Sequence, residues 1–211
     1  MSDAAGDNEE SIPLPIWLKK AIPFGGYTYK DYKKWEEGLR VELVNGIPRM
    51  MASPNEWHQW VIRRLLSQLD QQLNGKVCTP YSAPFDVRLF YEEDESDKII
   101  FQPDILVVCD PEKLKSGHGV KGTPDFIIVI LSEFNAGYDL IDKKSLYEKA
   151  GVKEYWIVSR DKLYVNILHN RTYQETVIPL DKSFKTKDYK QNIETLNCIL
   201  DFTDIIKRYN L

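Results

Sequence analysis

Four polar residues, each at or near the end of an expected helix or strand, have side chains that could take part in chemistry. They are Glu42, His58, Asp104 and Lys143. Carboxylates bind hard divalent cations, a lysine stabilises developing negative charge, and an imidazole transfers protons near neutral pH. Phosphodiester hydrolysis is one reaction that uses carboxylates and a lysine together, because it needs a bound cation, an activated water and a positive group.

Each of these residues also has a purely structural interpretation. Asp104 follows a proline and could form a turn at a strand entrance. Glu42 could be a solvent-facing charge on a short strand, and His58 a surface or packing histidine near a helix start. Lys143 has a second lysine beside it and could be an ordinary exposed helix residue. Local sequence leaves both interpretations open.

Length and composition indicate one globular domain. The chain has 211 residues and 24.6 kDa, with 43% hydrophobic and 28% charged residues, which suffices for one substantial core. We expect residues 1–25 to be a disordered leader and N-terminal extension, and residues 26–211 to form the single domain. No apolar run is long enough to cross a bilayer, so no membrane partner is expected.

Net charge and cysteine content bear on nucleic-acid binding, on disulfides and on the cellular compartment. The net charge is -4, whereas a protein dedicated to non-specific nucleic-acid binding is usually basic, so any DNA contact should be local. The three cysteines (Cys78, Cys109 and Cys198) are widely separated and odd in number, which argues against a disulfide framework and a zinc site. Together with the polar N-terminus, this favours the cytoplasm.

The first half of the chain predicts two helices and a hairpin. Thr28 is a candidate N-cap for a short helix ending near Gly38. Asn45-Gly46 lies between two short, mostly apolar segments (41–44 and 47–51) and is the strongest hairpin signal in the chain. Apolar residues recur at helical spacing from Glu56 to Leu73, which predicts an amphipathic helix.

The remaining chain predicts strands around a further helix. Strands are expected at residues 78–81, 85–91, 105–109, 126–131, 154–159 and 163–168, and helices at 139–150 and 202–209. The run 126–131 is entirely apolar, as in a strand buried on both faces. Asp139 opens its helix and could be an N-cap or a ligand. Tyr155 and Trp156 are expected in the core. The order of elements indicates an α/β fold with a mixed sheet.

Several segments at fixed mutual spacing together resemble one family of proteins. They are Val41–Gly46, His58-Gln59, Pro103-Asp104-Ile105, Pro124–Ser132, the helix with Asp139, Lys143 and Tyr147, and Gly151–Val158. This pattern, covering roughly residues 29–180, resembles the Uma-two family, which is classed with the restriction endonucleases in the PD-(D/E)XK nuclease superfamily. The resemblance implies a restriction endonuclease-like fold, with a central mixed β-sheet flanked by helices.

The resemblance also assigns roles to individual residues. The first acidic metal ligand maps onto Asp104, and the catalytic lysine onto Lys143, one helical turn before Tyr147. Glu42 and His58 match further polar positions near the site, and Glu42 could also hold metal-bound water. The backbone carbonyl of Ile130 would complete the ligands of Mg²⁺ or Mn²⁺. The implied function is metal-dependent cleavage of DNA, for which a homodimer is expected because cutting both strands favours two sites.

One position departs from the family pattern. The second acidic ligand maps onto Val129, which cannot bind a metal ion. We therefore expect weakened cation binding and absent or strongly reduced endonuclease activity, because the site keeps only half of its ligand charge. Two alternatives remain open: Glu133 or Asp125 supplies a carboxylate from elsewhere, or the valine is an engineered substitution. The rival interpretation is a non-catalytic nuclease-fold module for binding or assembly.

Two lysine-containing segments could touch phosphates. One contains Lys113, Lys115, His118 and Lys121, and the other contains Lys182, Lys185, Lys187 and Lys190. A run of charge is more often a solvated face, and that reading is favoured here. No sequence motif for reading bases is present.

Overall fold

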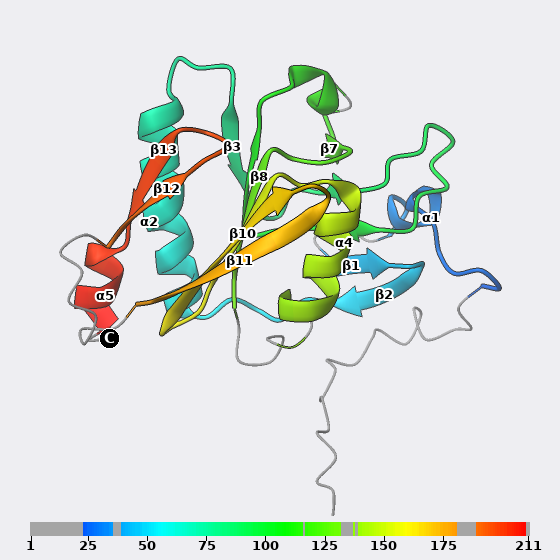
Figure 1. Ribbon diagram of the computed structural model, residues 1–211. Helices are drawn as coiled ribbons and strands as arrows, with labels where there is room; N and C mark the ends of the chain where they lie inside the picture. The colour runs from blue at the N-terminus through cyan, green and yellow to red at the C-terminus, as the bar shows by residue number, and fades with distance from the viewer. Residues whose placement is uncertain are drawn as a thin grey trace, which may run out of the picture.

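The computed structural model describes residues 23–35, 39–115, 117–131, 137, 139–180 and 189–209 (Figure 1). Its helices are α1 (Tyr29–Tyr32), α2 (Glu56–Leu73), α4 (Lys144–Ala150) and α5 (Thr203–Tyr209), with a 3-10 turn η1 (Pro111–Leu114) and a π-helical turn η2 (Asp139–Lys143). None of the helices in these residues is long and apolar enough to span a bilayer.

The larger sheet has six strands in the order β11-β10-β9-β8-β6-β3. Their bounds are β3 (Thr79–Ser82), β6 (Ile105–Val108), β8 (Phe126–Ile130), β9 (Glu154–Val158), β10 (Lys162–His169) and β11 (Thr172–Pro179). Strands β8 and β9 are parallel and the other neighbours are antiparallel. Parallel neighbours need a crossover, and η2 with α4 provides it between β8 and β9. The sheet is therefore mixed, as expected.

A second sheet has five short strands in the order β2-β1-β5-β4-β7. They are β1 (Val41–Val44), β2 (Ile47–Met50), β4 (Val87–Arg88), β5 (Ile100–Phe101) and β7 (Val120–Lys121). A separate hairpin pairs β12 (Lys190–Ile193) with β13 (Cys198–Asp201). The sequence predicted one central sheet, whereas the structure divides its strands among two sheets and this hairpin. The mixed α/β class is confirmed.

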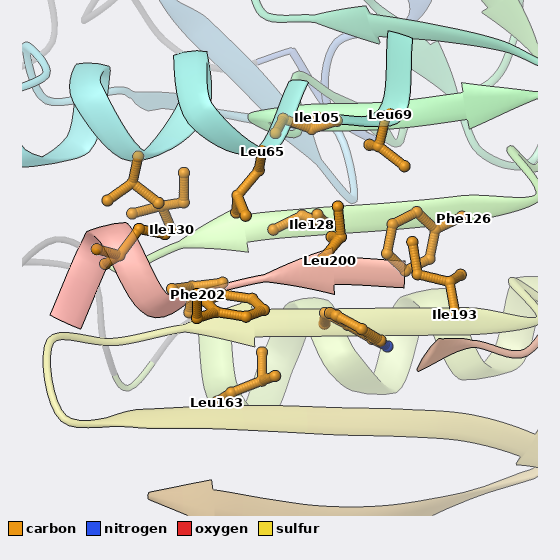
Figure 2. Close-up of a cluster of buried hydrophobic side chains, with 14 of the residues drawn as sticks. Leu65, Leu69, Ile105, Phe126, Ile128, Ile130, Leu163, Ile193, Leu200 and Phe202 are labelled. Carbon is orange, nitrogen blue, oxygen red and sulfur yellow. The ribbon is translucent and has the colours of Figure 1, made fainter. Parts of the chain in front are cut away.

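One face of the six-stranded sheet is covered by α2, the β12–β13 hairpin and α5. Figure 2 shows Leu65 and Leu69 of α2 facing the strand residues Ile105 and Ile128, with Leu200 of β13 close by. All five of these side chains are fully buried. The periodic apolar positions of α2 form this core, and the Asn55 side chain caps the helix by accepting a hydrogen bond from the His58 N–H.

Two glutamines of α2 bind the hairpin through its backbone. The side chain of Gln68 accepts from the Asp201 N–H and donates to the Asp201 carbonyl. Gln72, one helical turn later, makes the same pair of hydrogen bonds with the backbone of Ile199. The helix thus satisfies the backbone groups of β13 that point away from β12.

The opposite face of the six-stranded sheet packs against α4 and the five-stranded sheet. Val129 and Ile127 of β8, Tyr147 of α4, and Phe101 of β5 belong to one buried cluster on this side. The rings of Phe101 and Tyr147 meet edge to face with centroids 5.3 Å apart. We call this buried group the inter-sheet cluster. Side chains alternate along β8, so this strand is buried on both faces, as its apolar sequence predicts.

Most of the strongly periodic elements lie where the sequence predicts them. The Asn45-Gly46 turn joins β1 and β2 with both residues at positive φ, and α2 spans Glu56–Leu73 as expected. Thr28 does precede α1, but this helix ends at Tyr32, not near Gly38, and residues 36–38 lie outside the described part. The strand expected at 85–91 is reduced to two residues.

The sequence prediction about cysteines is wrong. Cys78 and Cys109 form a disulfide although they are 31 residues apart in the chain. Pairing of β3 with β6 brings them together, because the neighbouring residues Thr79 and Val108 face each other across the two strands. Cys198 is the free and buried third cysteine. Counting and spacing missed the disulfide because strand pairing determines which cysteines meet.

Candidate functional site

Glu42 and Lys143 form a buried ion pair between β1 and the end of η2. The Lys143 ammonium nitrogen lies 2.8 Å from Oε2 of Glu42 and 3.0 Å from Oε1. Glu42 also accepts a hydrogen bond of 3.0 Å from the backbone N–H of Gln102. Both carboxylate oxygens of Glu42 therefore have a partner, and the lysine is held above the Phe101 ring, 5.4 Å from its centroid.

Asp104 forms a second buried group with His58. Its Oδ1 lies 3.1 Å from Nε2 of His58, and its Oδ2 accepts a 2.7 Å hydrogen bond from the backbone N–H of Ile130. His58 reaches this position from the first turn of α2. Its Nδ1 is buried and has no hydrogen-bond partner in the described part of the chain. The burial of Glu42 excludes a solvent-facing charge there, and His58, with 12% of its side chain exposed, is not a surface histidine.

Residues 101–104 connect the two groups. Gln102 binds Glu42 through its N–H, Phe101 lies beneath Lys143, and Asp104 contacts His58. The same segment links β5 of the five-stranded sheet to β6 of the six-stranded sheet. The four polar residues singled out in the sequence are thus brought together as two pairs at the junction of the sheets.

Val129 lies beside Asp104 on the same face of the sheet. Strands β6 and β8 are antiparallel with Ile105 opposite Ile128, so continuing this register places Asp104 opposite Val129. Leu106 and Val129 both enter the inter-sheet cluster, and alternation places Asp104 on the same side as Leu106. Val129 is 4% exposed. A carboxylate at this position would adjoin that of Asp104.

The side chains present do not fit a site for a hard divalent cation. Such an ion needs several oxygen ligands, but Val129 offers none. The oxygens of Glu42 and Asp104 already bind Lys143, His58 and backbone N–H groups. Among the described residues, no three His, Cys, Asp or Glu side chains gather where they could hold a metal ion. The pairs thus occupy the carboxylates that a cation would need.

Of the two carboxylates proposed as replacements, Asp125 does not supply the missing ligand. Asp125 lies at the opposite end of β8, where it accepts from the Cys109 N–H and pairs with Lys153. Glu133 lies outside the described residues, and so does the side chain of Asp139. Ile130 contacts Asp104 through its N–H, and metal binding by its carbonyl stays a prediction.

A third polar cluster beside the site was missed by the sequence interpretation. Oδ1 of Asp86 accepts hydrogen bonds from Gln102 at 2.8 Å and from the Tyr32 hydroxyl at 3.0 Å. Burial raises the pKa of Asp86, the two hydrogen bonds lower it, and the charge of Glu42 raises it further. Burial and the neighbouring Asp86 also raise the pKa of Tyr32. No local sequence signal marks Asp86, because the three residues are remote in the chain.

The lysine segments are largely engaged within the protein. Lys113 donates to the carbonyl of Thr123, Lys115 pairs with Glu112, and the Lys121 nitrogen lies 5.1 Å from the centroid of the Tyr91 ring. Lys182, Lys185 and Lys187 lie outside the described residues. Lys190 is exposed at the start of β12. Among the described lysines of these segments, Lys113, Lys115 and Lys121 thus contact other groups of the protein.

Comparison with solved structures defines the class to which this fold belongs. The fold is a mixed α/β architecture similar to a crystal structure described as a putative nuclease of DUF820 from Anabaena variabilis ATCC 29413. The similarity has a TM-score of 0.64 and covers 85% of this chain and 97% of the other, at 14% sequence identity. A comparison with curated proteins finds no match.

The family follows from the sequence match. Residues 29–193 match the Uma2 family, which carries the description "Putative restriction endonuclease". This range covers most of the chain, including both residue pairs at the sheet junction. The protein belongs to the Uma2 family, as its sequence motifs indicated.

Proposed function

We propose that this chain is a restriction endonuclease-like protein that contacts DNA and has lost most or all of its phosphodiester hydrolysis. The family supports nuclease ancestry, and the geometry around Val129 supports the loss of activity. The observation that carries the proposal is that Val129 faces Asp104 across β6 and β8, where a second carboxylate would complete a cation site.

The surviving residues fit distinct roles in PD-(D/E)XK cleavage. Asp104 is the remaining acidic ligand, and Lys143 is placed to stabilise negative charge on a phosphate. Glu42 holds Lys143 in position through its ion pair, and His58 orients Asp104. With a glutamate at position 129 and the Ile130 carbonyl, Asp104 would form a ligand set for Mg²⁺ or Mn²⁺. With valine at position 129, the cation would bind weakly.

The direct test is to restore the carboxylate with Val129→Glu. We expect this variant to gain Mn²⁺ binding and metal-dependent nicking of plasmid DNA, because two adjacent carboxylates attract a divalent cation far better than one. Titration calorimetry measures cation binding, and gel electrophoresis of plasmid DNA measures nicking. Val129→Gln is the matched control, because it has nearly the same size and no charge.

Two results would contradict the proposal that Val129 is the cause of lost activity. Robust cutting by the unaltered chain, unchanged in Val129→Glu, would show that hydrolysis does not depend on this position. Cutting by Val129→Gln equal to that of Val129→Glu would show that charge is not the missing element. Adding Asp104→Asn to Val129→Glu should abolish any restored cutting.

A non-catalytic binding module is the second candidate. It is favoured by the closed pairing of Glu42 with Lys143 and of Asp104 with His58, which leaves these carboxylates occupied by protein groups. This function predicts no cation uptake in either the unaltered chain or Val129→Glu, together with a stable complex with DNA or with another protein. The same calorimetric titration therefore separates the two candidates.

A further inference from the structure

A hollow of about 900 Å³ lies beside the polar cluster of Asp86. It is bordered by α1, by β4 with the residues before and after it, and by the segment 117–121. Five aromatic side chains contribute to its wall, and we call it the aromatic hollow: Tyr29, Tyr32, Trp35, Phe85 and Tyr91. Such a density of rings in one polar hollow suits a flat, aromatic ligand.

The rings of the aromatic hollow are held in fixed positions. Trp35 and Tyr32 pack with centroids 5.1 Å apart. The Arg88 guanidinium lies 3.9 Å from the Tyr29 centroid and 4.5 Å from that of Tyr91, so it joins two walls. Arg88 is itself fixed by an ion pair with buried Asp97. A ligand entering the hollow therefore meets side chains that are already ordered, so binding costs little side-chain conformational entropy.

The charges in the hollow disfavour a phosphate as the main ligand. Three basic residues on its wall, Lys33, Arg88 and Lys121, are balanced by three acidic ones, Asp86, Glu93 and Glu95. Lys33 pairs with Glu95, and Arg88 is paired as described. A neutral ring with hydrogen-bonding edges fits this balance better than a polyanion.

The same hollow is also lined by polar groups that can form hydrogen bonds with the edge of such a ring. Asp86 and the buried Gln102 contribute a carboxylate and an amide to the wall, and the Tyr32 hydroxyl beside them is engaged with Asp86, Gln102 and the Val41 carbonyl. Oε1 of Gln102 has no hydrogen-bond partner in the described part of the chain. Donors and acceptors of this kind recognise the Watson–Crick edge of an unstacked base.

The aromatic hollow adjoins the candidate active site through one residue. The side chain of Gln102 lines the hollow, while its backbone N–H binds Glu42, the partner of Lys143. We propose that the aromatic hollow binds an unpaired base of a DNA strand whose backbone passes the Glu42–Lys143 pair. This inference rests on the proposed contact with DNA and adds single-stranded or flipped-out bases as the preferred substrate class.

The test compares strands that differ only in their bases. Fluorescence anisotropy measures binding of a labelled oligothymidylate, of the same strand with abasic sugars, and of a blunt duplex. We expect the base-bearing strand to bind about 10-fold or more tightly than the abasic strand, because stacking on aromatic side chains contributes strongly to affinity for each base. This comparison uses the unaltered chain and is independent of how any variant folds.

Two variants locate the effect in the hollow. Tyr91→Leu and Trp35→Leu should each weaken binding of the oligothymidylate by about 10-fold and leave binding of the abasic strand unchanged. Tyr164→Leu is the matched control, because Tyr164 lies on β10 of the other sheet, outside the hollow. Circular dichroism verifies that each variant is folded.

The outcomes separate this inference from the proposed function. Equal binding of base-bearing and abasic strands, or unchanged binding in Tyr91→Leu and Trp35→Leu, overturns the base-binding role. If Val129→Glu still cleaves plasmid DNA in that case, the proposed function stands and only this inference fails. If no DNA is bound by the unaltered chain and none is cleaved by Val129→Glu, both fail.

Discussion

Glu42 and Lys143 form a buried ion pair that contributes to the structure whatever its role in chemistry. Each charge is almost fully buried, and each would be costly alone in the interior. Together with the Gln102 N–H they satisfy one another. The pair is therefore stable in the interior whether or not a cation is bound nearby.

Breaking this pair should be costly for stability. We expect Lys143→Met to lower the free energy of unfolding by about 3 to 5 kcal/mol, because Glu42 is left buried without its partner. The double variant Glu42→Gln/Lys143→Met should recover part of that loss, since no charge remains. Urea unfolding followed by circular dichroism measures both. A double variant less stable than Lys143→Met would contradict this account.

Asp86 should make stability depend on pH in a defined direction. Its pKa is raised above the ordinary value of 3.8, chiefly by burial, so the folded protein holds this proton more tightly than the unfolded chain. The resulting stabilisation is complete below the unfolded pKa and is lost as pH rises through the folded pKa. Asp86→Asn keeps an oxygen acceptor for Gln102 and Tyr32 and removes this dependence.

The measurement is thermal unfolding of both proteins over a pH series. Relative to the unaltered chain, Asp86→Asn should gain stability as the pH rises from about 4 towards neutrality. The matched variant Asp94→Asn changes an exposed carboxylate in the loop before β5, for which this gain is not expected. A constant difference between Asp86→Asn and the unaltered chain at every pH would show that Asp86 does not titrate in this way.

At the scale of elements, the disulfide joins an edge strand to the strand that leads out of the site. Cys78 precedes β3, and Cys109 follows β6, which begins directly after Asp104. Strand β3 ends the six-stranded sheet on that side and is paired with β6 alone within the described strands. The covalent link therefore fixes a strand that hydrogen bonds hold on one side only.

Reduction should loosen this edge. Closing a loop of this length typically contributes about 2 to 4 kcal/mol, so dithiothreitol should lower the melting temperature of the unaltered chain. Cys78→Ser should already melt at the lower temperature and respond little to the reductant. Differential scanning calorimetry with and without dithiothreitol measures this. Equal melting temperatures in all four conditions would show that the link does not stabilise the fold.

Elements with strong local patterns were predicted well, and short ones were not. Helix α2 has a long apolar period and the β1–β2 hairpin has an Asn-Gly turn, so neighbouring residues determine both. Strands β5 and β7 have two residues each, too few for any alternation to show. Strand β11 is mostly exposed and rich in polar residues, and it pairs with β10 across a turn whose residues Asn170 and Arg171 both have positive φ.

At the scale of the whole molecule, the two sheets are what the sequence could not predict. Local patterns mark strands but do not say which strands share a sheet. Here β1, β4 and β5 belong to a separate five-stranded sheet and do not pair with the larger one. The family resemblance selected Glu42, His58, Asp104 and Lys143, whose pairing the structure shows. Asp86 and Gln102 escaped notice because only tertiary packing brings them beside Glu42.

The two glutamines of α2 affect whether the protein can associate with other copies of itself. An outer strand with bare N–H and C=O groups is a template on which a strand of another chain can add. Gln68 and Gln72 occupy those groups at Asp201 and Ile199. The amide side chains imitate a neighbouring strand, so this side of β13 is closed to β-type self-association.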